Sequence, residues 1–136
     1  MPKAITQKDS MGCSIACVAF VCGKSYDSAK KQFKNAGRAK TNGFICKEIV
    51  ESLARAGKSY KYNYIKRKSK WKEGTIVFIK RSKRYPAGHF LARAADGWMD
   101  PWIDWSECQD IRKAKAGFRK RLPGTPIYKI YINKPR

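Results

Sequence analysis

The sequence predicts one α+β domain, in which helices from the N-terminal half pack on an antiparallel β-sheet from the C-terminal half. The first observation is a change in the spacing of apolar residues along the chain. Apolar residues follow helical spacing up to about residue 56, whereas apolar and polar residues alternate from Lys58 onward. The second is the length of 136 residues, which suits one domain with a buried core. The sequence shows no repeat and no interdomain linker, so we assign residues 1–136 to a single domain.

Helices are expected throughout the first half of the chain. The first is apolar at nearly every position, which is typical of a helix surrounded by protein. Gly23 and Gly57 are expected to end the first and the third helix, as glycine commonly does. Ser25 is the expected N-cap of the second helix, and Thr41 or Asn42 that of the third. The expected ranges are about Cys13–Cys22, Tyr26–Asn35 and Phe44–Ala56.

The second half contains short strand-forming segments separated by turn signals. Tyr60, Tyr62 and Tyr64 alternate with polar residues, which is typical of a half-buried strand. The Asp96-Gly97 pair predicts a tight hairpin. Residues 103–121 are ambiguous between loop and short helix. The other expected strands are Thr75–Ile79, one beginning near His89, Trp98–Asp100 and Ile127–Ile132.

The composition is strongly basic. The chain has 31 Lys and Arg against 10 Asp and Glu, which gives a formal net charge of +21. Such a field attracts nucleic acid, acidic proteins and anionic surfaces, but it also serves simply to keep a protein soluble. Aromatic residues that could stack on bases are interleaved with the basic runs, although no recognised nucleic-acid-binding motif is present. The basic surface therefore has two interpretations: it contacts nucleic acid or an acidic protein, or it only keeps the protein soluble.

The cysteine count and the N-terminus indicate a cytoplasmic protein. Five cysteines are an odd number, without the density of a secreted disulfide scaffold. The sequence begins without a signal peptide, and the apolar run from Ile15 to Cys22 is too short to cross a bilayer. We expect no membrane span and a reducing environment in which the thiols stay free.

Cys13 stands where a polar, turn-forming run meets the first apolar helix. A thiol in the first turn of a helix faces the positive end of the helix dipole, which favours the nucleophilic thiolate. His89 is the one histidine of the chain, and the pair Asp100-Pro101 follows it. Cysteine, histidine and carboxylate in this order indicate a cysteine-nucleophile enzyme with His89 as its base.

This pattern resembles the papain-like cysteine peptidases, most closely the bacteriocin-processing peptidases that cleave double-glycine leaders. The resemblance covers about residues 7–102 and leaves the basic C-terminal segment, about 106–136, outside. Gly12 and Ser14 depart from the family, which often has aspartate and glycine there. The spacing between the histidine and the aspartate is also short. The matching positions are Gln7, Cys13, Ala16, His89-Phe90-Leu91 and Asp100-Pro101.

The resemblance implies a papain-like fold, with the cysteine on a central helix, and a role for each matching residue. Cys13 would attack a carbonyl carbon of a peptide or protein substrate, and His89 would pair with the thiolate and protonate the leaving group. Asp100 would orient His89. The Gln7 side-chain amide and the Cys13 backbone N–H would form the oxyanion hole. No cofactor is implied.

The hairpin predicted at Asp96-Gly97 conflicts with this role for Asp100. A two-residue loop there pairs Ala95 with Trp98 and places Asp104, rather than Asp100, opposite His89. Asp100 would then lie roughly 13 Å away along the strand at about 3.3 Å per residue. Asp100 can reach the histidine only if the turn centres nearer Ala94-Ala95 or a bulge shifts the ladder. We favour Asp100 on the resemblance and keep Asp104 as the geometric alternative.

Other readings remain open. The chain could be an inactive peptidase-like module that binds nucleic acid or an acidic protein, or a deamidase, transglutaminase or isopeptidase that uses the same thiolate. Cys13, Cys17, Cys22 and His89 could form a zinc site, but no Cys-x-x-Cys pair is present and we predict no metal. Cys46 and Cys108 are expected to be structural. Trp98, Trp102 and Trp105 could line a substrate groove or cover a face of the sheet.

Overall fold

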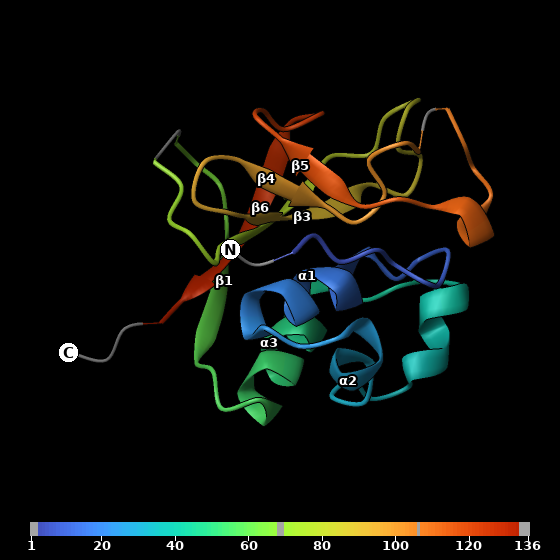
Figure 1. Ribbon diagram of the computed structural model, residues 1–136. Helices are drawn as coiled ribbons and strands as arrows, with labels where there is room; N and C mark the ends of the chain where they lie inside the picture. The colour runs from blue at the N-terminus through green and yellow to red at the C-terminus, as the bar shows by residue number, and fades with distance from the viewer. Residues whose placement is uncertain (1–2, 68–69, 106, 134–136) are drawn as a thin grey trace.

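The computed structural model describes residues 3–67, 70–105 and 107–133. The predicted α+β class is confirmed, because N-terminal helices pack on a C-terminal antiparallel sheet (Figure 1). Parts of the predicted basic segments, at residues 68, 69, 106 and 134–136, lie outside the described residues. The helices are α1 (Cys13–Cys22), α2 (Tyr26–Lys30) and α3 (Cys46–Arg55), and 3-10 turns span Ala36–Lys40 and Ile111–Lys113. The strands are β1 (Tyr60–Tyr64), β2 (Ile76–Ile79), β3 (His89–Arg93), β4 (Trp98–Asp100), β5 (Gly117–Arg119) and β6 (Pro126–Ile132).

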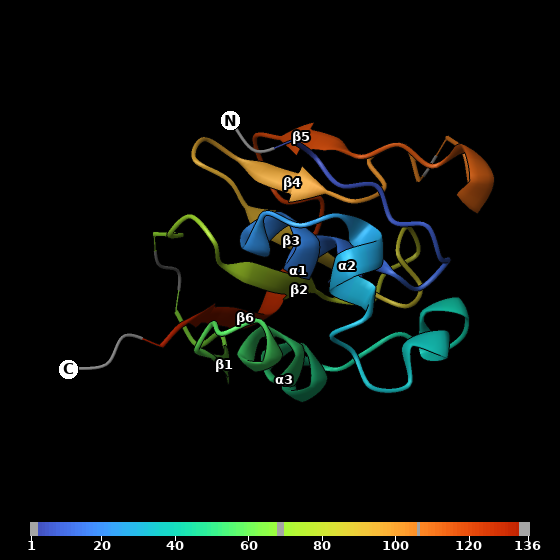
Figure 2. The same cartoon turned by 60° about the horizontal axis from the view of Figure 1, so that its bottom comes forward.

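The six strands form one antiparallel sheet in the order β1-β6-β2-β3-β4-β5. The last strand, β6, lies between β1 and β2, so the C-terminal segment completes the sheet. All three α-helices cover the same face of this sheet (Figures 1 and 2). Within the described ranges, no helix is both long and apolar enough to span a membrane.

Helix α1 is the centre of the core, as its apolar sequence predicts. Every side chain from Ile15 to Ala19 is fully buried. The helix packs against β3 on one side and against α2 and α3 on the others (Figure 2). Gly23 ends it in the left-handed conformation, with φ 66°, which glycine adopts without strain. The opposite face of the sheet carries a second apolar cluster formed by Val77, Ile79, Tyr85, Leu91 and Trp98.

Two helix boundaries differ from the prediction. Helix α2 ends at Lys30 instead of Asn35, and Asn35 itself has a positive φ of 55° that a right-handed helix cannot contain. Helix α3 begins at Cys46, and neither Thr41 nor Asn42 caps it. The Glu48 carboxylate accepts a hydrogen bond from the Ile45 N–H at 2.9 Å, so a side chain inside the helix caps it instead.

Candidate active site

Cys13 is the first residue of α1 and is half-exposed, as predicted for a thiol in the first turn. The preceding loop is held in place by a buried carboxylate. Asp9 accepts hydrogen bonds from the Tyr26 hydroxyl at 2.7 Å and from Lys30 Nζ at 2.9 Å. Burial works to raise the pKa of Asp9, but these two partners outweigh it and lower the pKa. The loop is therefore tied to α2 by a charged group that stays ionised.

Gly12, one of the departures from the family pattern, has a steric reason in this chain. A Cβ atom at residue 12 would lie 2.0 Å from the Tyr26 hydroxyl oxygen. That hydroxyl is the one bound to Asp9, so it has little freedom to move away. The same interaction that anchors the loop thus requires glycine immediately before the cysteine.

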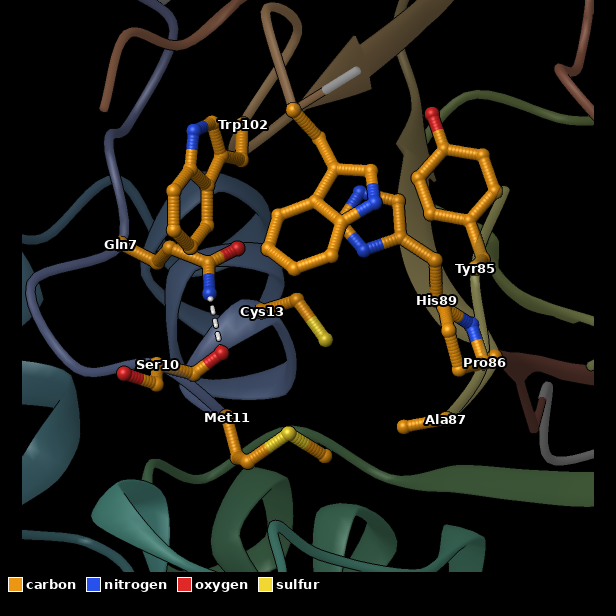
Figure 3. Close-up of a pocket in the computed structure, with 11 residues that line it drawn as sticks. Gln7, Ser10, Met11, Cys13, Tyr85, Pro86, Ala87, His89 and Trp102 are labelled. Carbon is orange, nitrogen blue, oxygen red and sulfur yellow. Dashed lines mark hydrogen bonds between the residues drawn. The ribbon is translucent and has the colours of Figure 1, made fainter. Parts of the chain in front are cut away.

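His89 lies at the start of β3 and contacts both partners that the sequence assigned to it. Its Nε2 is 2.6 Å from Asp100 Oδ1, and Cys13 lines the same pocket, close enough to raise the pKa of the imidazole. Because Asp100 occupies Nε2, the nitrogen left for the sulfur is Nδ1. In Figure 3 the Cys13 sulfur points across the pocket toward the imidazole. The Tyr85 ring stacks on the imidazole with centroids 4.9 Å apart and an interplanar angle of 8°, which fixes the ring plane.

Asp100 is fully buried yet has a partner for each carboxylate oxygen. Oδ1 faces His89 and also accepts the Trp102 N–H at 3.0 Å. Oδ2 accepts Arg119 Nε at 2.7 Å. Burial works to raise the pKa of Asp100, but the hydrogen bond and charge of His89, followed by those of Arg119, lower it to about 2. The carboxylate is therefore ionised at neutral pH although it is sealed from solvent.

The same contacts set the charge of His89. Burial works to lower the pKa of the imidazole, but the hydrogen bonds and charges of Asp100 and Cys13 raise it to about 9. His89 is therefore an imidazolium at neutral pH when the sulfur beside it carries a negative charge. This arrangement suits a thiolate–imidazolium pair, in which a base has already taken the proton of the nucleophile.

The predicted hairpin is present, but its register differs from that of a two-residue loop at Asp96-Gly97, and the difference brings Asp100 nearer to the histidine. Arg93 pairs with Trp98, so the loop contains four residues, 94–97, instead of two. Extending this register places Asp100 two residues from the position opposite His89, roughly 7 Å along the strand, instead of four. Asp104 is not the partner of the histidine, because its carboxylate accepts the Lys115 N–H at 3.1 Å.

Gln7 lines the pocket, but its amide nitrogen faces its own loop. Nε2 donates to the carbonyl oxygen of Asp9 at 3.0 Å. It also donates to that of Ser10 at 3.1 Å (Figure 3). The Gln7 Oε1 atom is buried and has no hydrogen-bond partner among the described residues. The side chain thus lines the same pocket as Cys13, while its role as an oxyanion donor stays a prediction.

The pocket itself is small and mostly apolar, with a volume of about 150 Å³. Cys13 and His89 lie on facing walls, and Trp102 and Trp105 form part of the lining. Trp98 belongs instead to the apolar cluster on the face of the sheet away from the helices. Trp102 and Trp105 therefore line the pocket, whereas Trp98 covers a face of the sheet.

The remaining cysteines lie in different surroundings. Cys17 is fully buried one turn after Cys13, and burial raises the pKa of its thiol well above the ordinary value. Burial also raises the thiol pKa of Cys22 and of Cys46, the latter to about 11. No three His, Cys, Asp or Glu side chains in the described ranges lie close enough together to hold a metal ion.

Sequence reasoning missed Arg119, because it lies in a basic run that is typical of a solvated surface. Strand β5 brings it under Asp100, where its guanidinium also donates to the Ile103 carbonyl at 3.0 Å and contacts the Tyr85 hydroxyl at 3.4 Å. With three residues, β5 is too short to give a periodic signal. Arg119 thus links the carboxylate, the loop after β4 and the ring that stacks on His89.

We predict that Arg119→Gln destabilises the fold, because it leaves one oxygen of a buried carboxylate without its ion pair. Losing one partner of such a pair costs about 3 kcal/mol in the free energy of unfolding. Arg121→Gln, an exposed position in the same basic run, is the matched control and should cost less than about 0.5 kcal/mol. Urea unfolding monitored by circular dichroism measures both, and equal stabilities would contradict the structural role of Arg119.

Cys13→Ala is expected to lower the pKa of His89, because the hydrogen bond and charge of the sulfur help to raise it. The chain has one histidine, so NMR resonances of its ring need no further assignment. A pH titration of these resonances measures the shift. Cys46→Ala removes a thiol that has no part in the pKa of His89 and should leave it unchanged. Identical titrations in wild type and Cys13→Ala would show that sulfur and imidazole do not interact.

Comparisons of the chain with protein-family models, with curated proteins and with solved structures found no match. A function for this chain must therefore follow from the chemistry of the site itself. That site consists of a thiol at a helix N-terminus, an imidazole beside it, a buried carboxylate behind the imidazole and a pocket in front.

Proposed function

We propose that this protein is a papain-like, thiol-dependent hydrolase, and specifically a cysteine peptidase that acts on peptide bonds. The observation that carries the proposal is the contact between Cys13 and His89 on the walls of an open pocket, with Asp100 hydrogen-bonded to the far nitrogen of the ring. A nucleophile, its base and a group that orients the base are the three parts that covalent catalysis by a side chain requires.

In the first half of the reaction, the Cys13 thiolate attacks the carbonyl carbon of the scissile amide, and the carbonyl oxygen becomes an oxyanion. The backbone N–H groups at the start of α1 have no acceptor within the helix, so the Cys13 N–H is available to this oxygen. The His89 imidazolium then donates its Nδ1 proton to the amine, the carbon–nitrogen bond breaks, and a thioester remains on Cys13.

In the second half, a water molecule attacks the thioester carbon. Neutral His89 takes a proton from this water, and the carbon–sulfur bond breaks to release a carboxylic acid and the Cys13 thiolate. Asp100 stays ionised throughout, because its two oxygens keep His89 and Arg119 as partners. Its function is to hold Nδ1 toward the sulfur and to stabilise the imidazolium.

The substrate and the setting follow from the charge and the thiols. A net charge of +21 favours encounter with acidic substrates or with proteins bound to polyanions. All five cysteines are free, which fits a reducing, cytoplasmic environment. Deamidation, transglutamination and isopeptide cleavage pass through the same thioester, so product analysis must separate them from peptide hydrolysis.

Iodoacetamide is expected to alkylate Cys13 ahead of the other four cysteines near neutral pH, because only Cys13 lies beside the imidazolium. Peptide mapping by mass spectrometry gives the rate at each site. His89→Ala should slow the reaction at Cys13 at least tenfold, whereas Cys46→Ala should not change it. Hydrolysis of a fluorogenic peptide library should disappear in Cys13→Ala, and hydrolysis that survives this substitution would overturn the proposal.

The pH profile of kcat/KM should report the imidazolium. Because the pKa of His89 is raised to about 9, the protonated ring persists at neutral pH and is lost as the pH rises through about 9. Activity should therefore hold from neutral pH to about 9 and then decline. A decline centred on 6.5, the ordinary value for histidine, would contradict the proposed electrostatics of the site.

A further inference from the structure

The sheet has an uncovered region at its β1–β6 end, on the face opposite the helices. Lys61 lies opposite Tyr131, and Lys129 lies opposite Asn63 and Val77. Residues directly opposite in an antiparallel pair share a face. Val77 belongs to the apolar cluster on the face away from the helices, so the two lysines project from that face as well. Trp71, Trp105 and Leu122 pack on this face over β2, β3 and β4, whereas β1 and β6 lie toward the end of the sheet.

This region is hollowed and strongly basic. Two adjoining hollows of about 550 and 640 Å³ share Lys129, and together we call them the basic trough. Glu73 is the single acidic residue that lines it among the described residues. Within that same part of the chain, none of the cations that line the trough is in an ion pair. These cations are Lys61, Lys66, Arg67, Lys70, Lys72 and Lys129.

Aromatic rings lie among these cations. The Tyr131 ring has the Lys61 and Lys129 ammonium groups 5.3 and 4.9 Å from its centroid. Its hydroxyl is hydrogen-bonded to the Asn63 amide, which fixes the ring between the strands. Tyr131 and Trp71 line the first hollow and are partly exposed, so a ring of the trough is open to a ligand. The trough therefore combines ammonium groups held in position with an accessible ring.

We propose that the basic trough binds single-stranded nucleic acid. A groove of cations that follows a phosphate backbone, with aromatic rings on which bases stack, is the arrangement that binds such strands without sequence preference. An acidic peptide would use the cations but not the exposed ring. Strand β2 lies between β6 and β3, which carries His89, so the trough is separate from the catalytic pocket and its occupancy does not depend on hydrolysis.

Binding of a fluorescein-labelled oligothymidylate of about 20 nucleotides to the full chain tests this proposal by anisotropy. Lys61→Glu/Lys129→Glu should weaken binding at least tenfold. Lys31→Glu/Lys34→Glu, at exposed positions near α2, is the matched control, because both variants change the net charge from +21 to +17. The control should lose less than threefold. Tyr131→Ala should lose about fivefold or more, the cost of one stacked base.

Several results would overturn the proposal. Equal losses in the two charge variants would show that binding is spread over the whole basic surface. Displacement of the oligonucleotide by polyglutamate of equal total charge, as readily as by unlabelled oligothymidylate, would assign the trough to acidic proteins. Preference for duplex DNA would exclude a single-strand site. Alkylation of Cys13 at the wild-type rate verifies that each variant is folded. The binding results stand by themselves, because they do not require the protein to hydrolyse peptides.

Discussion

The buried carboxylate of Asp100 is the constraint on which the rest of the site depends. Removing an ionised group from water costs several kcal/mol, and only good hydrogen-bond partners offset this cost. Asp100 obtains them from His89 on β3, from the Trp102 N–H beyond β4, and from Arg119 on β5. These partners come from different segments, so the carboxylate fixes the relative positions of the strands at the end of the sheet that carries His89.

Helix α1 brings Cys13 to this end of the sheet. Because α1 is surrounded by protein, its N-terminus can shift little, and Cys13 is held at the level of His89. The loop before it is fixed from the other side by Asp9, which binds Tyr26 and thereby requires Gly12. The geometry of the pair thus results from two buried carboxylates, one behind the histidine and one behind the loop.

The parts of the site that depend on local sequence patterns, the first helix and the cysteine at its start, could be predicted from the sequence. The apolar run of α1, the thiol at its start and the single histidine, together with the family resemblance, predicted that Cys13 lies beside His89. The hairpin register was not predictable, because Asp96-Gly97 favours a two-residue turn locally, while the observed register lets Asp100 meet its partners. Arg119 was missed for a related reason, since only the fold distinguishes a partly buried, ion-paired arginine from its exposed neighbours in a basic run.

The central claim is that Cys13 and His89 act as one nucleophilic unit, and acyl-enzyme formation tests it most directly. Incubation with p-nitrophenyl acetate should release a burst of about one equivalent of nitrophenol, and mass spectrometry should locate the acetyl group on Cys13. The burst should be absent in Cys13→Ala, strongly slowed in His89→Ala and unchanged in Cys46→Ala. Release without a burst, or an acetyl group distributed over several cysteines, would contradict the account.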